Sequence, residues 1–160
     1  MPDRFAHCTF CGARFTPGQP WPRRCAACGE TSYRNPTPVA VAVQPVGAGL
    51  LAVRRGIPPA HGLLALPGGF IEVGETWQQA TVRELREETT VSQEPSSVRL
   101  FDTLSAPDGT LLIFGLLPPL ETLPSFTPTD ETLELSTLTA PTELAFDLHT
   151  QTATRWLTTP

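Results

Sequence analysis

The segment from Gly69 to Val91, GFIEVGETWQQATVRELREETTV, constrains the fold more than any other part of the chain. In it, Thr76 followed by Gln79 has the form of a capping box, in which each side chain accepts a hydrogen bond from a free backbone N–H at a helix start. We therefore predict a helix that begins near Trp77. The face of this helix that is expected to pack carries Thr81, Val82 and Leu85.

Three carboxylates, Glu84, Glu87 and Glu88, share another face of the predicted helix because they are spaced i, i+3, i+4. Like charges at i, i+4 destabilise a helix by roughly a few tenths of a kcal/mol, so Glu84 and Glu88 suggest a cation between them. Oxygen ligands select hard ions such as Mg²⁺ or Mn²⁺, and Mg²⁺ usually adds substrate phosphates to a few carboxylates. The alternative is a solvated helix face paired with Arg83 and Arg86.

The whole segment resembles the Nudix box, a pattern with nine fixed places. The matching residues are Gly69, Glu75, Arg83, Glu84, Leu85, Glu87, Glu88 and Val91. Thr90 stands where the pattern has Gly, at the expected helix end, where a β-branched residue adopts a left-handed conformation only with strain. The preceding residues, ending in LPGGF, are also similar to the approach to the box in zinc-ribbon Nudix hydrolases.

This resemblance covers residues 5 to 157 and implies the α/β class, an α/β/α sandwich with a mixed sheet preceded by a small zinc ribbon. It implies a metal-dependent pyrophosphatase, using Mg²⁺ or Mn²⁺, that hydrolyses a nucleoside diphosphate linked to another moiety. The catalytic residues that it implies are Glu84, Glu87, Glu88, Arg83 and Glu75. Of these, the three carboxylates of the helix are the expected metal ligands.

Two further roles follow from the resemblance. Gly68 and Gly69 are expected to offer backbone contacts to the substrate phosphates, because glycine lets the backbone approach a ligand closely. Arg83 and Glu75 are expected to join the loop to the helix by a charge-assisted pair.

A fourth carboxylate ligand is expected from the segment TDETLE at 129 to 134. In zinc-ribbon Nudix enzymes a Glu in a similar segment, shortly before the last strand, completes the metal cluster. Glu131 matches that place, and Glu134 is the competing candidate. The alternative for this position is an ordinary polar residue of a strand.

All four cysteines lie near the start of the chain, in two Cys-x2-Cys-Gly units separated by thirteen residues: Cys8, Cys11, Cys25 and Cys28. This is the spacing of a zinc ribbon, in which two short knuckles direct four thiolates to one tetrahedral ion. A cytosolic setting disfavours the alternative of two disulfides. An iron site of the rubredoxin type uses similar knuckles, so the spacing leaves zinc and iron open.

The ribbon has a structural or a nucleic-acid-binding role. Arg14, Arg23 and Arg24, together with Trp21, are of the residue types that contact nucleic acid. We favour the structural role, because closed zinc sites supply folding energy and the arginines are few.

Length and charge set the remaining expectations. The 160 residues, 40% of them hydrophobic, suffice for one cored domain and an appendage; we expect the ribbon at 1–36 and the hydrolase domain at 37–160. After residue 36, six Arg stand against fourteen acidic residues, with no Lys, so a nucleic-acid partner is not expected. Neither a membrane span nor a signal peptide is recognisable, and a cytoplasmic protein is expected. The sequence leaves open whether the protein forms a homodimer.

Alternating apolar residues predict the remaining elements. Strands at 39–43 and 50–54 are expected to pair antiparallel around a turn at Gly47 to Gly49. Further strands are predicted at 98–105, 110–117 and 133–138, and a closing helix at 147–157.

Comparison with the Nudix hydrolases that the chain resembles reduces the number of expected substrates. NADH pyrophosphatases carry Ser-Gln-Pro-Trp after the box, whereas residues 105–110 here read SAPDGT, which counts against NADH. The segments IPPAHG at 57–62 and LAFDLHT at 144–150 favour ADP-ribose or FAD. The alternatives are a non-catalytic Nudix-like module that senses ADP-ribose, and an RNA cap-end hydrolase with the ribbon as its RNA contact.

Overall fold

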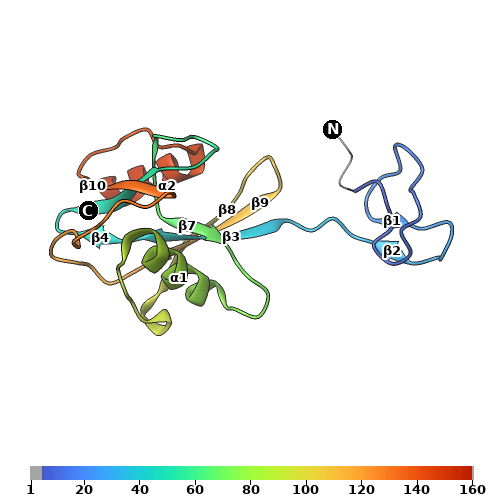
Figure 1. The fold of residues 1–160 in the computed structure, drawn as a ribbon, viewed down its shortest axis with the longest axis horizontal. Helices are drawn as coiled ribbons and strands as arrows, with labels where there is room; N and C mark the ends of the chain where they lie inside the picture. Colours follow the sequence, from blue (N-terminus) through green and yellow to red (C-terminus); the bar gives the residue numbers. More distant parts are fainter. Residues whose placement is uncertain (1–4, 160) are drawn as a thin grey trace. The chain divides into compact units, whose positions relative to one another are not determined.

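The computed structural model describes residues 5–159 and divides the chain into two compact units, Met1–Pro36 and Thr37–Pro160 (Figure 1). The first unit contains two short antiparallel strands, β1 (Arg23–Arg24) and β2 (Thr31–Ser32). Two tight turns accompany them, each closed by a glycine N–H that donates to a cysteine carbonyl: Gly12 to Cys8 at 3.0 Å and Gly29 to Cys25 at 2.9 Å. Both glycines have φ near +75°, which glycine adopts without strain.

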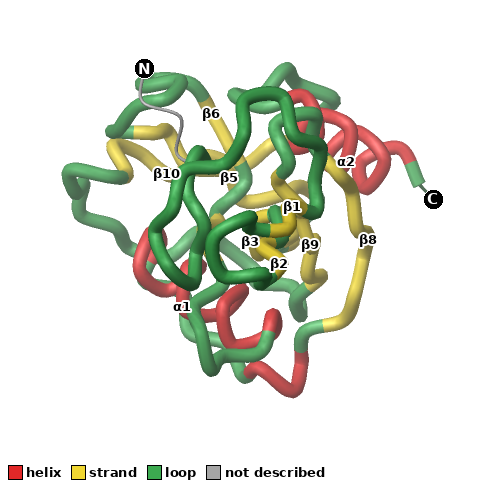
Figure 2. The backbone as a smooth tube through the Cα atoms, turned by 90° about the vertical axis from the view of Figure 1, so that its right-hand side faces the viewer, coloured by secondary structure: helices red, strands yellow, loops and turns green. Residues whose placement is uncertain are grey.

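The second unit contains two four-stranded sheets (Figure 2). The first, in spatial order, consists of β7 (Gly68–Phe70), β3 (Thr37–Val43), β9 (Thr110–Leu116) and β8 (Arg99–Ser105). The second consists of β10 (Thr132–Leu138), β5 (Gly49–Arg55) and β4 (Pro45–Val46), with β6 (Leu64–Ala65) also paired to β5. Strands β3 and β9 run parallel and the other pairs antiparallel, so the first sheet is mixed.

The predicted hairpin between 39–43 and 50–54 is wrong, because β3 and β5 lie in different sheets. The chain passes from one sheet to the other at Gln44, directly before Pro45, which has no N–H with which to continue the ladder of β3. The buried side-chain amide of Gln44 donates to the carbonyls of Pro45 at 2.9 Å and Pro118 at 2.7 Å. Strand β5 pairs instead with β4 and β10.

Two helices, α1 (Trp77–Thr89) and α2 (Asp147–Thr158), cover opposite faces of the β layer (Figure 1). Alternate residues of β3 and β5 enter two separate apolar clusters. The cluster shared with α2 contains Val41, Val43, Leu50, Ala52 and Ala153. The cluster shared with α1 contains Ala42, Leu51, Val53 and Leu85. This confirms the α/β/α sandwich with a mixed sheet.

Helix α1 begins at the predicted residue, with both hydrogen bonds of the capping box formed between Thr76 and Gln79. The helix ends at Thr89, and Thr90 takes the left-handed conformation with φ of +67°, so the place where the Nudix box has Gly requires that conformation here too. A left-handed non-glycine residue costs about 1 kcal/mol.

The strands near 98–105, 110–117 and 133–138 and the closing helix form within two residues of their predicted bounds. A 3-10 turn, η1 (Pro95–Ser97), follows α1. Across residues 5–159, none of the helices combines the length and the apolar character that crossing a membrane requires.

Candidate functional site

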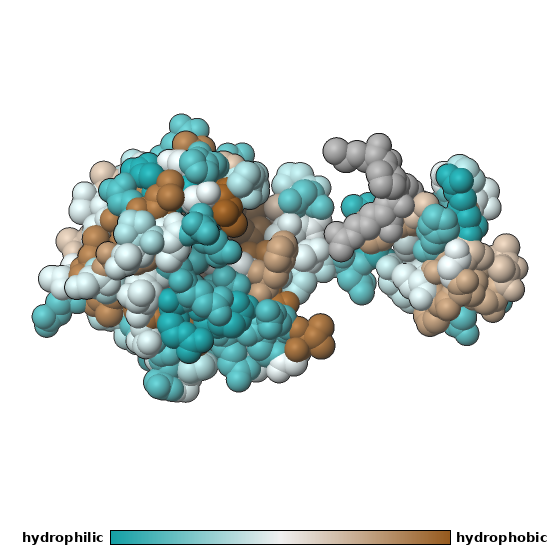
Figure 3. All heavy atoms as spheres, in the orientation of Figure 1, coloured by the Kyte–Doolittle hydropathy of each residue, from teal (hydrophilic) through white to brown (hydrophobic). Residues whose placement is uncertain are grey.

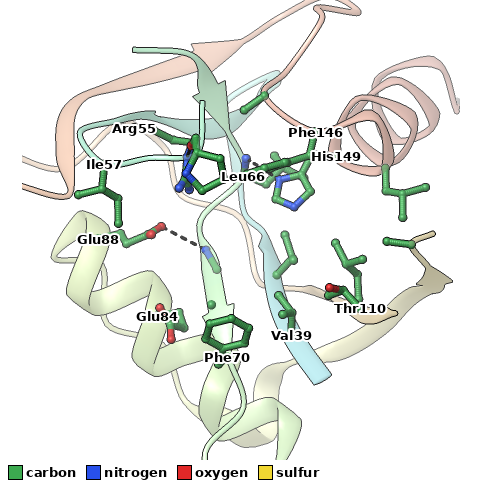
Figure 4. A pocket seen from close by; sticks show the side chains of 18 of the residues that line it. Val39, Arg55, Ile57, Leu66, Phe70, Glu84, Glu88, Thr110, Phe146 and His149 are labelled. Carbon is green, nitrogen blue, oxygen red and sulfur yellow. Dashed lines mark hydrogen bonds between the residues drawn. The ribbon is translucent and has the colours of Figure 1, made fainter. Parts of the chain in front are cut away.

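A cavity of about 920 Å³ lies in the second unit, between α1, the segment after β5 and the N-terminal end of α2 (Figure 4). Such a volume lies within the range of small-molecule sites in proteins. One half of its lining is acidic and the other is apolar. Hydrophilic side chains also gather on the surface over α1 (Figure 3).

The acidic half combines carboxylates from two distant parts of the sequence. Helix α1 supplies Glu84, Glu87 and Glu88, and Glu131 joins them from the loop before β10. The backbone of this loop is tied to the end of β5, because Gly56 N–H donates to the carbonyl of Glu131 at 2.7 Å. Glu134 instead lies within β10 and pairs with Arg54, its Oε2 being 2.8 Å from Arg54 Nε. The structure thus brings Glu131, and not Glu134, to the cavity.

Arg83 connects the loop before α1 to the carboxylates of α1. Its guanidinium makes a two-point contact with Glu75, at 2.7 and 3.2 Å, and donates to the carbonyl of Phe70 at 2.9 Å. The same group contacts Glu84 at 2.7 Å and Glu87 at 3.2 Å. The hydrogen bond from Arg83 holds the pKa of Glu75 below its usual value. The ion pairs that the solvated-face alternative requires therefore exist for Glu84 and Glu87.

Glu88 does not fit the alternative of a solvated, ion-paired helix face, because within residues 5–159 no cation pairs with it. Its Oε2 accepts a hydrogen bond from Gly68 N–H at 3.1 Å. Burial raises the pKa of Glu88 to about 8, and the charge of Glu84 adds to this, whereas the Gly68 hydrogen bond opposes it. Burial also raises the pKa of Glu84, opposed by Arg83. An oxygen-only set with an unpaired, desolvated carboxylate fits a hard divalent cation such as Mg²⁺ or Mn²⁺.

Gly68 and Gly69, both on β7, lie so close to β3 and α1 that a side chain at either position would force its neighbour to shift. A β-carbon on Gly69 would lie 2.5 to 2.6 Å from the carboxyl atoms of Glu84. A β-carbon on Gly68 would lie 2.8 Å from the α-carbon of Val41. These glycines therefore allow the carboxylates to approach the backbone of β7. Their expected contact with substrate phosphates stays a prediction.

The apolar half of the cavity, which we define by Val39, Val41, Leu66, Leu112, Phe146 and Leu148, was not foreseen from the sequence. Arg55 and His149 also line the cavity. The guanidinium of Arg55 lies 5.1 Å from the centre of the Phe146 ring, and its Nε donates to the carbonyl of Pro59 at 2.9 Å. A lone arginine at a strand end and a lone histidine in a helix carry no pattern that marks a site.

In the first unit the four cysteines form one cluster, their Sγ atoms all lying within 4.8 Å of one another. All four are free thiols, with Sγ atoms of Cys8 and Cys28 3.8 Å apart and those of Cys11 and Cys25 3.7 Å apart. The backbone N–H groups of Cys11 and Phe10 lower the pKa of Cys8 to about 6. The geometry fits a tetrahedral ion such as Zn²⁺.

The charge balance of the cluster points the same way. The backbone N–H of Glu30 favours the thiolate form of Cys28 and so lowers its pKa. Desolvation and the neighbouring thiols outweigh this effect and raise the pKa of Cys28 to about 12. Without a cation, four thiolates this close do not ionise together. A bound metal ion would remove that penalty.

Arg23, one of the arginines considered for nucleic-acid contact, is engaged within the first unit. Its guanidinium lies over the rings of Trp21 and Phe15, at 4.5 and 5.6 Å, and Nε donates to the carbonyl of Gln19 at 2.7 Å. Phe15 is buried beside Cys8 and Cys25. Arg23 thus stabilises the small core around the cysteines.

Comparison with known proteins places these features in a family. Residues 35–158 match the family model of the NUDIX domain. An ADP-ribose pyrophosphatase of Methanocaldococcus jannaschii is 44% identical over 59 residues, covering 37% of this chain and 34% of that protein. The NAD-capped RNA hydrolase NudC of Salmonella heidelberg is 36% identical over 84 residues, covering 51% of this chain and 32% of that protein. The chain thus spans about a third of the length of these two relatives.

The similarity extends over nearly the full length in one solved structure. The crystal structure of a NUDIX hydrolase from Nitrosomonas europaea superposes with a TM-score of 0.73 and 27% sequence identity. The match covers 95% of this chain and 90% of that one.

Proposed function

The chain belongs to the NUDIX domain family, and from this we propose that it hydrolyses the pyrophosphate bond of a nucleoside diphosphate linked to another moiety. ADP-ribose or FAD is the favoured substrate. The observation that carries the proposal is the cavity with two chemically different halves, four carboxylates on one side and an apolar lining on the other. Residues 1–36 are proposed to be a separate zinc ribbon, and residues 37–160 the hydrolase domain.

Glu84, Glu87, Glu88 and Glu131 would hold the Mg²⁺ or Mn²⁺. Such a cation, when bound, neutralises phosphate charge and lowers the pKa of an attacking water. Arg83 and Glu75 hold α1 against the loop and so position these carboxylates. Arg55 also lines the cavity, and its guanidinium would donate hydrogen bonds to the diphosphate. Whichever carboxylate of the box is released from the cation during the reaction would take the proton from water.

The adenosine-containing substrates are supported by the name of the Methanocaldococcus jannaschii relative, an ADP-ribose pyrophosphatase. NADH is less favoured because residues 105–110 read SAPDGT. An ADP-ribose sensor without activity is disfavoured because the chain retains all four glutamates of the box, Glu75, Glu84, Glu87 and Glu88.

Hydrolysis of capped RNA ends is the second candidate, favoured by the match to the NAD-capped RNA hydrolase of Salmonella heidelberg. Two observations weigh against it: the fourteen acidic residues against six Arg after residue 36, and the engagement of Arg23 within the ribbon. A polyanion would meet net repulsion there.

The test is a substrate panel of ADP-ribose, FAD, NADH, NAD, nucleotide sugars and an NAD-capped RNA, each with Mg²⁺ or Mn²⁺, scored for released mononucleotide. We expect AMP from ADP-ribose or FAD at the highest kcat/KM. Preference for the capped RNA would favour the second candidate, and binding of ADP-ribose without any product would favour the sensor.

Substitution of the carboxylates tests the metal face directly. Glu87→Gln and Glu88→Gln keep side-chain size and remove charge, so each should lower turnover by roughly two orders of magnitude or more at unchanged helical content. Glu94→Gln is the matched control, because Glu94 lies outside the cavity and makes no side-chain cap to η1. Full activity in both variants would refute the ligand assignment.

A further inference from the structure

We propose that the apolar half of the cavity binds the adenine ring of the substrate, and that His149 recognises the ring by donating a hydrogen bond from Nε2 to one of its nitrogen atoms. The proposal deepens the proposed function, since it rests on the ligand being an adenine nucleotide. His149 would then be a specificity-determining residue.

His149 is buried at the start of α2, with 6% of its surface exposed. Its Nδ1 accepts a hydrogen bond from the backbone N–H of Leu66 at 3.2 Å. Because Nδ1 acts as an acceptor, the proton of the neutral ring resides on Nε2. No residue between 5 and 159 accepts a hydrogen bond from Nε2, and this nitrogen points away from Leu66 into the cavity (Figure 4).

Two aromatic rings fix the direction of this donor. Phe114 and Phe146 lie edge-to-face against the imidazole, with ring centres 5.8 and 5.1 Å away. The backbone N–H of His149 donates to the carbonyl of Phe146 at 3.0 Å, which holds the main chain of His149 at the helix start. Burial lowers the pKa of His149 to about 4, and the charge of Arg55 acts in the same direction. At neutral pH His149 is therefore an uncharged donor in a set orientation.

The surroundings of Nε2 select the ligand chemistry. Val39, Leu66 and Leu112 line the cavity with apolar side chains, and apolar contact suits the face of an aromatic ring and not a phosphate. Leaving the Nε2 donor unpaired in an apolar cavity costs free energy. The site therefore selects a ligand that offers an acceptor to Nε2 over a ligand that offers none. Adenine offers ring nitrogens as acceptors on a planar, uncharged body.

The other half of the cavity accounts for the rest of the nucleotide. Arg55 lies between the apolar half, where it stacks on Phe146, and the carboxylates, since its charge acts on Glu88 as well as on His149. A nucleotide with its base against His149 would therefore direct its phosphates past Arg55 towards α1. This orientation brings the diphosphate to the proposed metal ligands.

Two variants separate recognition from structure. In His149→Asn, Oδ1 can replace Nδ1 as the acceptor for Leu66 N–H, but nothing replaces Nε2. In His149→Gln, the longer side chain can place an NH₂ group near Nε2 but gives up the Leu66 contact. The probes are AMP and ribose 5-phosphate, which differ only in the base, with affinities measured by calorimetry and thermal melting as the check on folding.

We expect His149→Asn to weaken AMP binding by roughly tenfold, the worth of one hydrogen bond, and to leave ribose 5-phosphate unchanged. His149→Gln should retain more of the AMP affinity. Equal weakening of both probes would mean a merely structural role, and unchanged AMP affinity would exclude the contact; either result overturns the proposal.

Wild-type protein provides a test that needs no variant to fold. AMP analogues in which N1, N3 or N7 is replaced by C–H should bind alike except one, which loses roughly tenfold. Equal binding of all three would overturn the proposal. If AMP binding depends on His149 while no panel substrate is hydrolysed, the inference stands and the proposed function fails. If ADP-ribose is hydrolysed with a KM that is unchanged in His149→Asn, the proposed function stands and the inference fails.

Discussion

The backbone of Gly69 lies directly against the carboxylate of Glu84, so that a β-carbon on Gly69 would stand 2.5 Å from Glu84 Oε1. The contact joins β7, which begins directly after Pro67, to the acidic face of α1. Arg83 reinforces it, because the same guanidinium contacts Glu84 and the carbonyl of Phe70 next to Gly69. The position of a proposed metal ligand is thus determined by the absence of a side chain on the neighbouring strand.

Gly69→Ala should displace Glu84 from this position and lower turnover by about 100-fold, the scale expected for a misplacement of about 1 Å at a catalytic site. Helical content should stay unchanged, because α1 keeps its capping box. Val73→Ala, fully exposed in the loop that follows β7, is the control and should behave as wild type. Wild-type kinetics in Gly69→Ala would show that Glu84 can move without consequence.

Glu131→Gln should weaken the apparent affinity for Mg²⁺ or Mn²⁺ and lower kcat, because this carboxylate lines the cavity with the three glutamates of α1. Glu134→Gln is the matched control: it lies three residues away and pairs with Arg54 on the second sheet. Metal titration of both variants measures the difference. Sensitivity of Glu134→Gln alone would contradict the assignment, and insensitivity of both would confine the site to α1.

The stability of the protein without Mg²⁺ or Mn²⁺ should fall as the pH rises from about 4.5 towards 8. The pKa of Glu88 is raised to about 8 in the folded state from 4.5, so the folded state binds this proton more tightly than the unfolded chain does. The stabilisation is complete below 4.5 and is lost as the pH passes 8. Urea denaturation at pH 5 and 8, compared between wild type and Glu88→Gln, isolates this contribution.

The control for the urea denaturation is the same measurement in the presence of the divalent cation. Saturating Mg²⁺ should reduce the fall in wild type, because a bound cation favours the ionised carboxylate, and should have a smaller effect on Glu88→Gln, which lacks that carboxylate. An identical pH dependence in both proteins without the cation would mean that Glu88 is not desolvated in the folded state.

Metal analysis should find about one equivalent of zinc, or of iron, held by Cys8, Cys11, Cys25 and Cys28. Removal by a chelator should increase hydrogen exchange in residues 5–36 far more than in 37–159, because a closed thiolate site supplies folding energy to its own unit. Cys25→Ser should have the same effect. Two disulfides by mass spectrometry, with no metal, would exclude the site.

The sequence by itself determined the features that depend on neighbours along the chain. The capping box of Thr76 and Gln79, the shared face of Glu84, Glu87 and Glu88, and the two cysteine knuckles all follow from local geometry. For the same reason the helix start at Trp77 could be predicted to the residue. The Nudix resemblance added Glu131, which no local pattern indicates.

Tertiary structure alone decided which distant segments meet. It separated β3 from β5, because Pro45 ends one ladder and the Gln44 amide satisfies the carbonyls at the corner. It brought Arg55 and His149 into one cavity, with Nδ1 of His149 engaged by Leu66 N–H, 83 residues earlier in the chain. Sequence spacing carries no information about such contacts, because they depend on how the sheets and helices pack and not on the geometry of a single turn or helix.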